Sequence, residues 1–173
     1  MAKDTLETLL AKEEIRELVL LYSRAVDRKD IALLRDLYTA DATDTHGNSF
    51  DGPADAYCDF LELSLPHMPY SGHHVCNHLI HVDGNEGDGE VYAIAWHVIP
   101  DRDGSGLKHD VRLVRYLDRY RREEDGRWRF AKRVVTYDAQ LVLPADQAPA
   151  SYADGDPSYA ELLSRLFARG ARG

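Results

Sequence analysis

The segment His73 to His78 reads HHVCNH and is the densest group of chemically active side chains in the sequence. A neutral imidazole accepts a proton near neutral pH without tuning by its surroundings, and it is also a common metal ligand. Strand alternation would place His73 and Asn77 on one face and a row of His74, Cys76 and His78 on the other. A linear row binds metal only with a closing ligand from another element, so we expect proton chemistry and no metal here.

Four further residues are candidates for a polar pocket. Arg133 alternates with small, apolar and aromatic residues, so it needs a buried partner or an anionic ligand. Tyr22 could donate a hydrogen bond to a substrate oxygen. His97 and His109 lie at alternate positions of apolar runs and are both candidates to line the pocket, although core histidines with satisfied hydrogen bonds are the favoured interpretation.

Helical periodicity dominates the first third of the chain. Leucines and other apolar residues from Leu6 to Val26 recur every three or four positions, which predicts one long amphipathic helix. Asp30 is placed to cap a shorter second helix. The polar run around His46 predicts a hairpin turn, and Pro53 opens a third helix.

Strand periodicity dominates the rest. Four runs with a period of two cover residues 73–82, 88–100, 107–122 and 127–138, separated by glycine-rich turns. Three helices followed by these strands predict an α+β domain in which a curved sheet wraps the helices and encloses a pocket. We assign residues 1–143 to this domain. Residues 144–173 are expected to be a linker and a terminal helix near 159–168 that closes the pocket or contacts a neighbouring subunit, within the same domain.

Composition narrows the classes of partner. The chain has 173 residues and a formal net charge of −9, which disfavours binding to nucleic acid. No apolar stretch approaches the roughly 20 residues of a membrane span, and the N-terminus lacks a signal-peptide core. We therefore expect a cytoplasmic protein that acts on a small molecule. The two cysteines, Cys58 and Cys76, lack the spacing of a zinc site or a disulfide framework.

Three segments together resemble the SnoaL-like proteins of the nuclear-transport-factor-2-like superfamily. They are IRELVLLYSRAVDRKDIALLRDLYTADAT, HHVCNHLIHVDG and GRWRFAKRVV, and the resemblance covers about residues 10–140. It implies a cone-shaped antiparallel or mixed sheet around three N-terminal helices, with the pocket inside the cone. Scytalone dehydratase, hexachlorocyclohexane dehydrochlorinase and the bile-acid dehydratases resemble this chain, and they are cofactor-free lyases with an Asp–His pair.

The resemblance also assigns residues. It implies that Asp27 and His73 are the catalytic pair, that Asn77 follows on the same strand face, and that Arg133 is the arginine of the late strand. Two positions depart from the family pattern: Tyr22 stands where the dehydrochlorinase has lysine, and Val26 stands where scytalone dehydratase has tyrosine. These departures bear on the identity of the substrate and not on the fold.

We interpret the chain as a cofactor-independent lyase, most similar to a dehydratase, that acts on a small cyclic hydroxy-carbonyl compound. His73 would remove the proton, Asp27 would support His73, and Tyr22 and Arg133 would stabilise charge on oxygen, with His97 and His109 as further substrate contacts. A homodimer or homotrimer is expected from the sheet edges and aromatic strands.

Three alternatives stay open at this point. One is a non-catalytic domain that binds a small molecule, and another is the small subunit of a dioxygenase. The third is an isomerase like ketosteroid isomerase, because the position of Tyr22 resembles that of the tyrosine of that enzyme. For that isomerase, the place of the carboxylate base is held by His46, and Asp44 lies two residues earlier.

Overall fold

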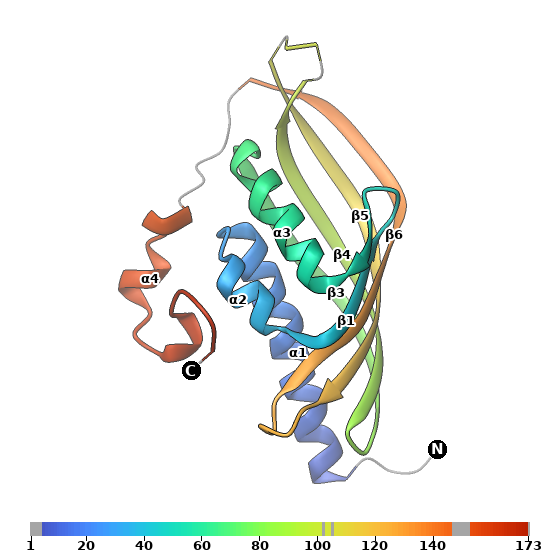
Figure 1. The fold of residues 1–173 in the computed structure, drawn as a ribbon. Helices are drawn as coiled ribbons and strands as arrows, with labels where there is room; N and C mark the ends of the chain where they lie inside the picture. The colour runs from blue at the N-terminus through green and yellow to red at the C-terminus, as the bar shows by residue number, and fades with distance from the viewer. Residues whose placement is uncertain (1–4, 102, 105, 147–152, 173) are drawn as a thin grey trace.

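The computed structural model describes residues 5–101, 103–104, 106–146 and 153–172. Helices dominate the first part of the chain and long strands the second (Figure 1). The order of the main elements is α1 (Leu6–Asp27), α2 (Ile31–Asp36), β1 (Tyr38–His46), β2 (Phe50–Pro53), α3 (Ala54–Ser64), β3 (Tyr70–Asp83), β4 (Glu86–Pro100), β5 (Leu107–Arg122), β6 (Trp128–Ala145) and α4 (Ser158–Glu161). Single 3₁₀ turns are η1 (Leu65–His67), η2 (Ala153–Gly155) and η3 (Arg165–Phe167).

The six strands form one sheet in the order β2-β1-β6-β5-β4-β3. Neighbouring strands are antiparallel except β1 and β6, which are parallel, so the sheet is mixed. The sheet curves around α1, α2 and α3 and does not close (Figure 1). This arrangement confirms the α+β cone predicted from the sequence.

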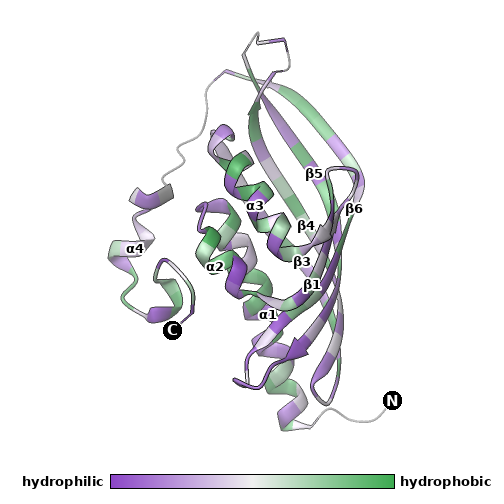
Figure 2. Cartoon of the chain, in the orientation of Figure 1, coloured by the Kyte–Doolittle hydropathy of each residue, from purple (hydrophilic) through white to green (hydrophobic). Residues whose placement is uncertain are grey.

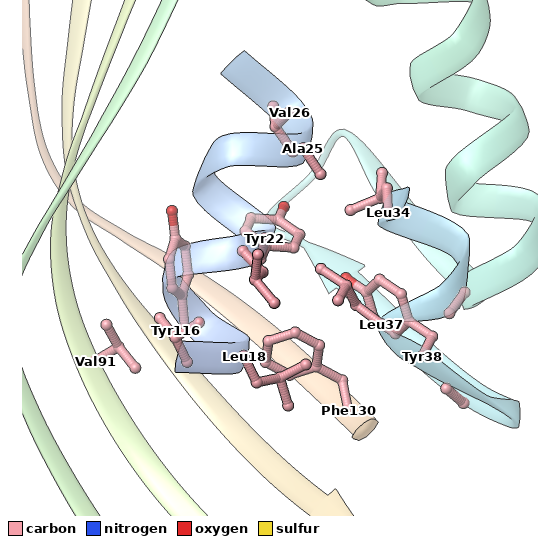
Figure 3. Close-up of a cluster of buried hydrophobic side chains, with 14 of the residues drawn as sticks. Leu18, Tyr22, Ala25, Val26, Leu34, Leu37, Tyr38, Val91, Tyr116 and Phe130 are labelled. Atoms are coloured by element: carbon pink, nitrogen blue, oxygen red, sulfur yellow. The ribbon is translucent and has the colours of Figure 1, made fainter. Parts of the chain in front are cut away.

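The hydrophobic core lies between the helices and the concave face of the sheet. Figure 2 shows the alternation of apolar and polar residues that lets each element bury one side. On α1, the buried stripe includes Leu18 and Tyr22, which are 1% exposed. Figure 3 shows these side chains packed with Leu34 of α2 and Tyr116 and Phe130 of the sheet. The apolar stripe predicted from the helical periodicity is therefore the face of α1 that packs against the sheet.

One ion pair lies inside this apolar core. Arg133 of β6 and Asp118 of β5 face each other in the strand register, and both side chains are fully buried. Nε and Nη2 of the guanidinium donate to the two carboxylate oxygens, each at 2.7 Å. The guanidinium carbon lies 4.1 Å from the ring centroids of both Tyr22 and Phe130. The bidentate partner and the aromatic faces together offset the cost of removing the charges from water.

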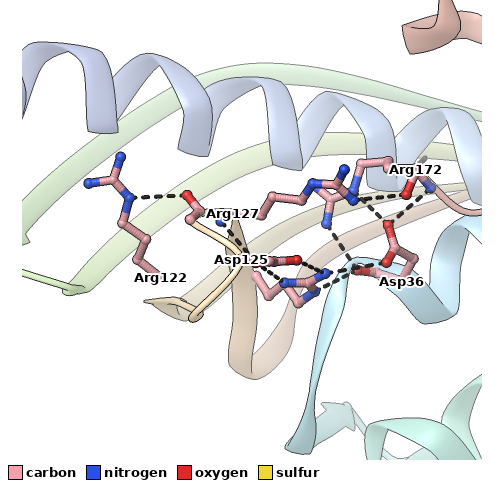
Figure 4. Close-up of polar contacts among 7 residues, drawn as sticks. Asp36, Arg122, Asp125, Arg127 and Arg172 are labelled. Atoms are coloured by element: carbon pink, nitrogen blue, oxygen red, sulfur yellow. Dashed lines mark hydrogen bonds and ion pairs between the residues drawn. The ribbon is translucent and has the colours of Figure 1, made fainter.

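The C-terminal segment packs against the outer side of the helices, away from the sheet (Figure 1). Figure 4 shows its last anchor, where Arg172 donates from Nε to the Asp36 carboxylate at 2.8 Å. Arg127 donates to the Arg172 carbonyl at 2.8 Å. The terminal helix expected near 159–168 is shorter than predicted, because the structure has the four-residue α4 and the 3₁₀ turn η3 there. The predicted start of the linker at 144 is also early, since β6 runs to Ala145.

No helix in the described part of the chain has the length and apolar content that crossing a membrane requires.

Breaking the buried ion pair from one side should strongly destabilise the fold. We expect Arg133→Met to lower the free energy of unfolding by about 3–5 kcal/mol, because it leaves the buried Asp118 carboxylate without its cationic partner and with the Tyr120 hydroxyl, at 3.0 Å, as its remaining side-chain donor. The double variant Arg133→Met with Asp118→Leu should recover most of that loss, since no buried charge remains. Urea denaturation at neutral pH measures both values, and a double variant no more stable than Arg133→Met would contradict this account.

Candidate active site

The end of α1 positions the first residue of the site. Asp27 is the last helical residue, and Lys29 two residues later takes the left-handed conformation with φ of 56°. The Asp30 amide donates to the Ala25 carbonyl at 2.8 Å and the Lys29 amide to the Val26 carbonyl at 3.1 Å. This is the Schellman pattern that ends a helix sharply. It leaves the Asp27 side chain beside β3.

Asp27 and His73 form a close hydrogen-bonded pair. The Asp27 Oδ1 atom lies 2.6 Å from Nδ1 of His73, and Oδ2 accepts the His73 backbone amide at 2.9 Å. The buried Ser71 hydroxyl donates to Oδ1 at 3.1 Å. A carboxylate at Nδ1 holds the ring proton there, so Nε2 is the nitrogen available as a base. The sequence therefore predicted a pair that the fold brings together across 46 residues.

The electrostatics of Asp27 favour its ionised form. Burial alone would raise the pKa of this carboxyl, but the positive charge of His73 and the hydrogen bonds from His73 and Ser71 outweigh burial. The net result is a pKa below the ordinary value of an aspartate. Asp27 thus stays a carboxylate that can balance an imidazolium on His73.

His73 opens into a cavity of about 170 Å³ between the helices and the sheet. Apolar and aromatic side chains make up most of the lining, and many of the lining residues also carry a polar or titratable group. Those polar or titratable side chains are Tyr22, His46, Ser49, Tyr57, Ser64, His73, His97, Asp110, Arg112, Tyr116 and Tyr137. No residue of the described C-terminal segment lines the cavity. The expectation that this segment closes the pocket is therefore wrong for its described residues.

His97 lies next to the pair on β4. Its ring centroid is 5.4 Å from that of His73, in an edge-to-face arrangement. Burial, followed by the positive charge of His73, lowers the pKa of His97 to about 3. His97 is therefore neutral near pH 7 and lines the cavity, as the sequence allowed.

His46, which lines the same cavity, is also paired with an aspartate. His46, at the end of β1, places Nδ1 2.6 Å from Oδ1 of the buried Asp44. The turn after His46 depends on Gly47, because φ is 51° and a Cβ there would lie 2.5 Å from the Tyr137 ring. Tyr57 of α3 stacks on the His46 ring with centroids 4.6 Å apart.

Sequence reasoning did not assign these residues a joint role. The alternation of a strand over Asp44 and His46 was the available signal, because residues two apart share a strand face. Tyr57 gave no such signal, since it fits the apolar stripe of α3. Asp110 and Arg112 of β5 also line the cavity and were not singled out as site residues. They bind each other through Nη2 of Arg112 at 2.8 Å.

A β-bulge changes the faces predicted for the segment that follows His73. The register between β3 and β4 shifts between Val75 and His78, which inserts one extra residue in β3. Asn77 is exposed and does not line the cavity, whereas His78 turns inward and contacts Tyr120 with Nε2 3.1 Å from the hydroxyl. The shared face expected for His73 and Asn77 is therefore wrong, as is the expected row of His74, Cys76 and His78.

Two other candidates also lie outside the cavity lining. His109 accepts a hydrogen bond from Trp96 at 3.0 Å, on the face of the sheet opposite His97. Arg133 is enclosed in the core by Asp118 and aromatic rings, so the partner that its position required is a protein carboxylate. In the described part of the chain, no three histidine, cysteine or acidic side chains gather as metal ligands would.

The fold and its pocket define a class of protein. An α+β cone with an open mixed sheet and an internal cavity is the architecture of the nuclear-transport-factor-2-like superfamily. Residues 7–134 match the SnoaL-like domain, and the chain belongs to that family. The resemblance drawn from the sequence is thereby confirmed. No curated protein matches the sequence.

Solved structures with the same fold share little sequence with this chain. A candidate scytalone dehydratase from Novosphingobium aromaticivorans is 20% identical, with a TM-score of 0.69 over 82% of this chain and 93% of its own. A type 2 hexachlorocyclohexane dehydrochlorinase is 20% identical, with a TM-score of 0.70 over 84% and 96%. The type 3 dehydrochlorinase of Novosphingobium barchaimii is 19% identical, with a TM-score of 0.69 over 81% and 94%. At this level of identity the similarity establishes the fold.

The half-buried His97 should make the fold sensitive to acid. The unfolded chain binds a proton on this ring near pH 6.5, whereas the folded chain binds it only near pH 3. Stability is therefore full above pH 6.5 and falls by up to about 1.4 kcal/mol per pH unit as the pH drops toward 3. We expect His97→Gln to flatten this part of the curve of unfolding free energy against pH.

The matched control for that measurement is His109→Gln, on the opposite face of the same pair of strands. It should leave the slope between pH 6.5 and 3 as in the wild type. Equal slopes for wild type and His97→Gln, measured by urea denaturation at a series of pH values, would contradict the burial argument.

Proposed function

We propose that this protein is a cofactor-independent lyase of the dehydratase type, which eliminates water from a small cyclic hydroxy-carbonyl compound. The observation that carries the proposal is the Asp27–His73 pair at the wall of a mostly apolar cavity. A general base needs a lone pair directed to the substrate and a partner for the charge that it gains. His73 Nε2 supplies the first, and the ionised Asp27 supplies the second.

The reaction would begin with removal of the proton next to the substrate carbonyl. His73 Nε2 takes this proton, the electron pair of the C–H bond forms the new C=C bond, and the β-hydroxyl group departs. Asp27 balances the imidazolium that forms and keeps the ring in the tautomer that presents Nε2. The side chains of His73 and Asp27 are 8% and 16% exposed, so water weakens their electrostatic interaction little.

The size of the cavity supports a compact substrate. An apolar cavity of about 150 Å³ accommodates a benzene molecule, so one of about 170 Å³ suits a single ring. The aromatic side chains around it fit the flat faces of such a ring. The names of two structural neighbours, a candidate scytalone dehydratase and a hexachlorocyclohexane dehydrochlorinase, refer to eliminations on cyclic compounds, which agrees with the proposed reaction class.

The carboxylate required for the isomerase alternative is engaged elsewhere. Asp44 is fully buried, accepts the Tyr38 hydroxyl at 2.7 Å and pairs with His46. It therefore has no oxygen directed to a substrate. A domain that binds the same class of molecule without turning it over is the second candidate, because the cavity satisfies its requirements equally well.

Loss of His73 should abolish elimination while the fold persists. With 3-hydroxycyclohexanone as a single-ring probe, formation of cyclohexenone is followed by ultraviolet absorbance. We expect His73→Ala to lower the rate by roughly 10²–10⁴-fold, because the base is gone. Asp27→Asn should lower it comparably, since an amide at Nδ1 no longer stabilises the imidazolium.

The neighbouring His74→Ala is the matched control, because His74 is exposed and faces away from the cavity. It should retain wild-type turnover. Saturable binding of a cyclic ketone, measured by calorimetry, without turnover by the wild type would favour the binding domain and refute the lyase.

A further inference from the structure

The second Asp–His pair continues into a chain of hydroxyl groups. Nε2 of His46 lies 3.1 Å from the Tyr57 hydroxyl, which lies 3.1 Å from the Tyr22 hydroxyl. Both hydroxyl groups belong to tyrosines that line the cavity, and both side chains are nearly inaccessible to bulk water. Tyr22 in turn meets the ring of His73 edge to face, with centroids 6.4 Å apart. The chain therefore runs from Asp44 to the neighbourhood of the proposed base.

Counting protons gives this chain two possible states. The Asp44 contact keeps a proton on Nδ1 of His46 in both. If Nε2 of His46 is bare, Tyr57 must donate to it, and Tyr22 then donates to Tyr57 with its only proton. If Nε2 carries a proton, it donates to Tyr57, Tyr57 donates to Tyr22, and the Tyr22 proton is released for a group in the cavity. The state of His46 thus decides what Tyr22 offers to a substrate.

Both tyrosines are suited to pass a proton on without remaining as phenolates. Burial is the main cause that raises the pKa of Tyr22 and of Tyr57 above the ordinary value. Each phenol therefore keeps a proton and can lose one only as it receives another. A concerted shift along the chain meets that condition.

We propose that Asp44, His46, Tyr57 and Tyr22 form a proton-delivery chain that supplies the acid half of the elimination. The inference rests on the proposed function, in which His73 supplies the base half. Tyr22 is the group that touches the leaving oxygen, while Tyr57 and His46 replenish it. Asp44 positions His46 and balances its charge.

The proton and electron balance of the step is closed. His73 Nε2 takes the carbon-bound proton, and the C–H electron pair becomes the C=C bond. The C–O bond breaks with its pair on oxygen, which receives the Tyr22 proton and leaves as water. Tyr57 passes its proton to Tyr22, and His46 passes its Nε2 proton to Tyr57. After the step His73 is cationic and His46 is neutral, and exchange with solvent restores both.

His46 meets charged or titratable groups from each element packed around it. Asp44 contacts it from β1 and Tyr57 from α3. From β6, the Tyr137 hydroxyl donates to the His46 carbonyl at 3.3 Å, and Arg112 of β5 lies over the Tyr137 ring at 4.7 Å. Asp44 is the group in direct contact that can balance a proton gained by His46.

Two substrates that differ in their leaving group allow the acid half and the base half of the elimination to be tested separately. Hydroxide needs a proton to leave, whereas acetate does not, and 3-hydroxycyclohexanone and 3-acetoxycyclohexanone give the same enone. We expect Tyr57→Phe to lower turnover of the hydroxy compound by about 10²-fold or more, and that of the acetoxy compound by less than about threefold. His46→Gln should show the same contrast. His73→Ala should impair both substrates, because both need the base.

Equal impairment of the two substrates by Tyr57→Phe would overturn the delivery chain while leaving the lyase intact. If neither His73→Ala nor Tyr57→Phe reduces turnover, the proposed function itself is refuted. The two failures are thus distinguishable.

A measurement without turnover tests the chain directly. The Cζ carbon of Tyr22, observed by NMR with labelled tyrosine, should shift as His46 titrates in the wild type. In Tyr57→Phe the link is cut, and the shift of Tyr22 with His46 protonation should vanish. A Tyr22 signal that is independent of His46 in the wild type would overturn the proposal, whatever the activity.

Discussion

The pairing of Arg133 with Asp118 is the constraint on which the rest of the structure depends. Two fully buried charges must be paired with good geometry, or the fold loses several kcal/mol. Satisfying them fixes the register of β5 against β6 and the positions of the aromatic rings that enclose the guanidinium. One of those rings belongs to Tyr22, so the same interaction that holds the core together also sets one side of the cavity.

The histidines of two Asp–His pairs line the same cavity. His73 is held by an aspartate at a helix end, and His46 by an aspartate on the same strand. Each ring has its Nδ1 nitrogen at a carboxylate, which orients Nε2 toward the cavity or its hydroxyl chain. An elimination needs a base and an acid on different atoms of one small substrate. In the proposed elimination, the two Asp–His pairs would supply these two functions separately, so that no group would have to change its role within a turnover.

The sequence predicted the fold well where local patterns were sufficient. Period-three and period-four spacing located α1, and period-two spacing with glycine turns located the four long strands. It failed where one inserted residue mattered, because the bulge near Asn77 reverses the alternation of β3 and nothing in the local pattern marks it. It also overestimated the terminal helix, since helical spacing in a short segment is insufficient when few apolar contacts support it.

The sequence by itself determined the family, the α+β class and the Asp27–His73 pair, because these depend on periodicity and on recognisable segments. The tertiary structure decided that Arg133 is a core ion-pair partner and that His46, Tyr57 and Tyr22 join in one chain. Those relations link β1, α3 and α1, and they exist only once the sheet has curved around the helices. Strand register and helix packing are set by long-range burial, which local residue patterns do not encode.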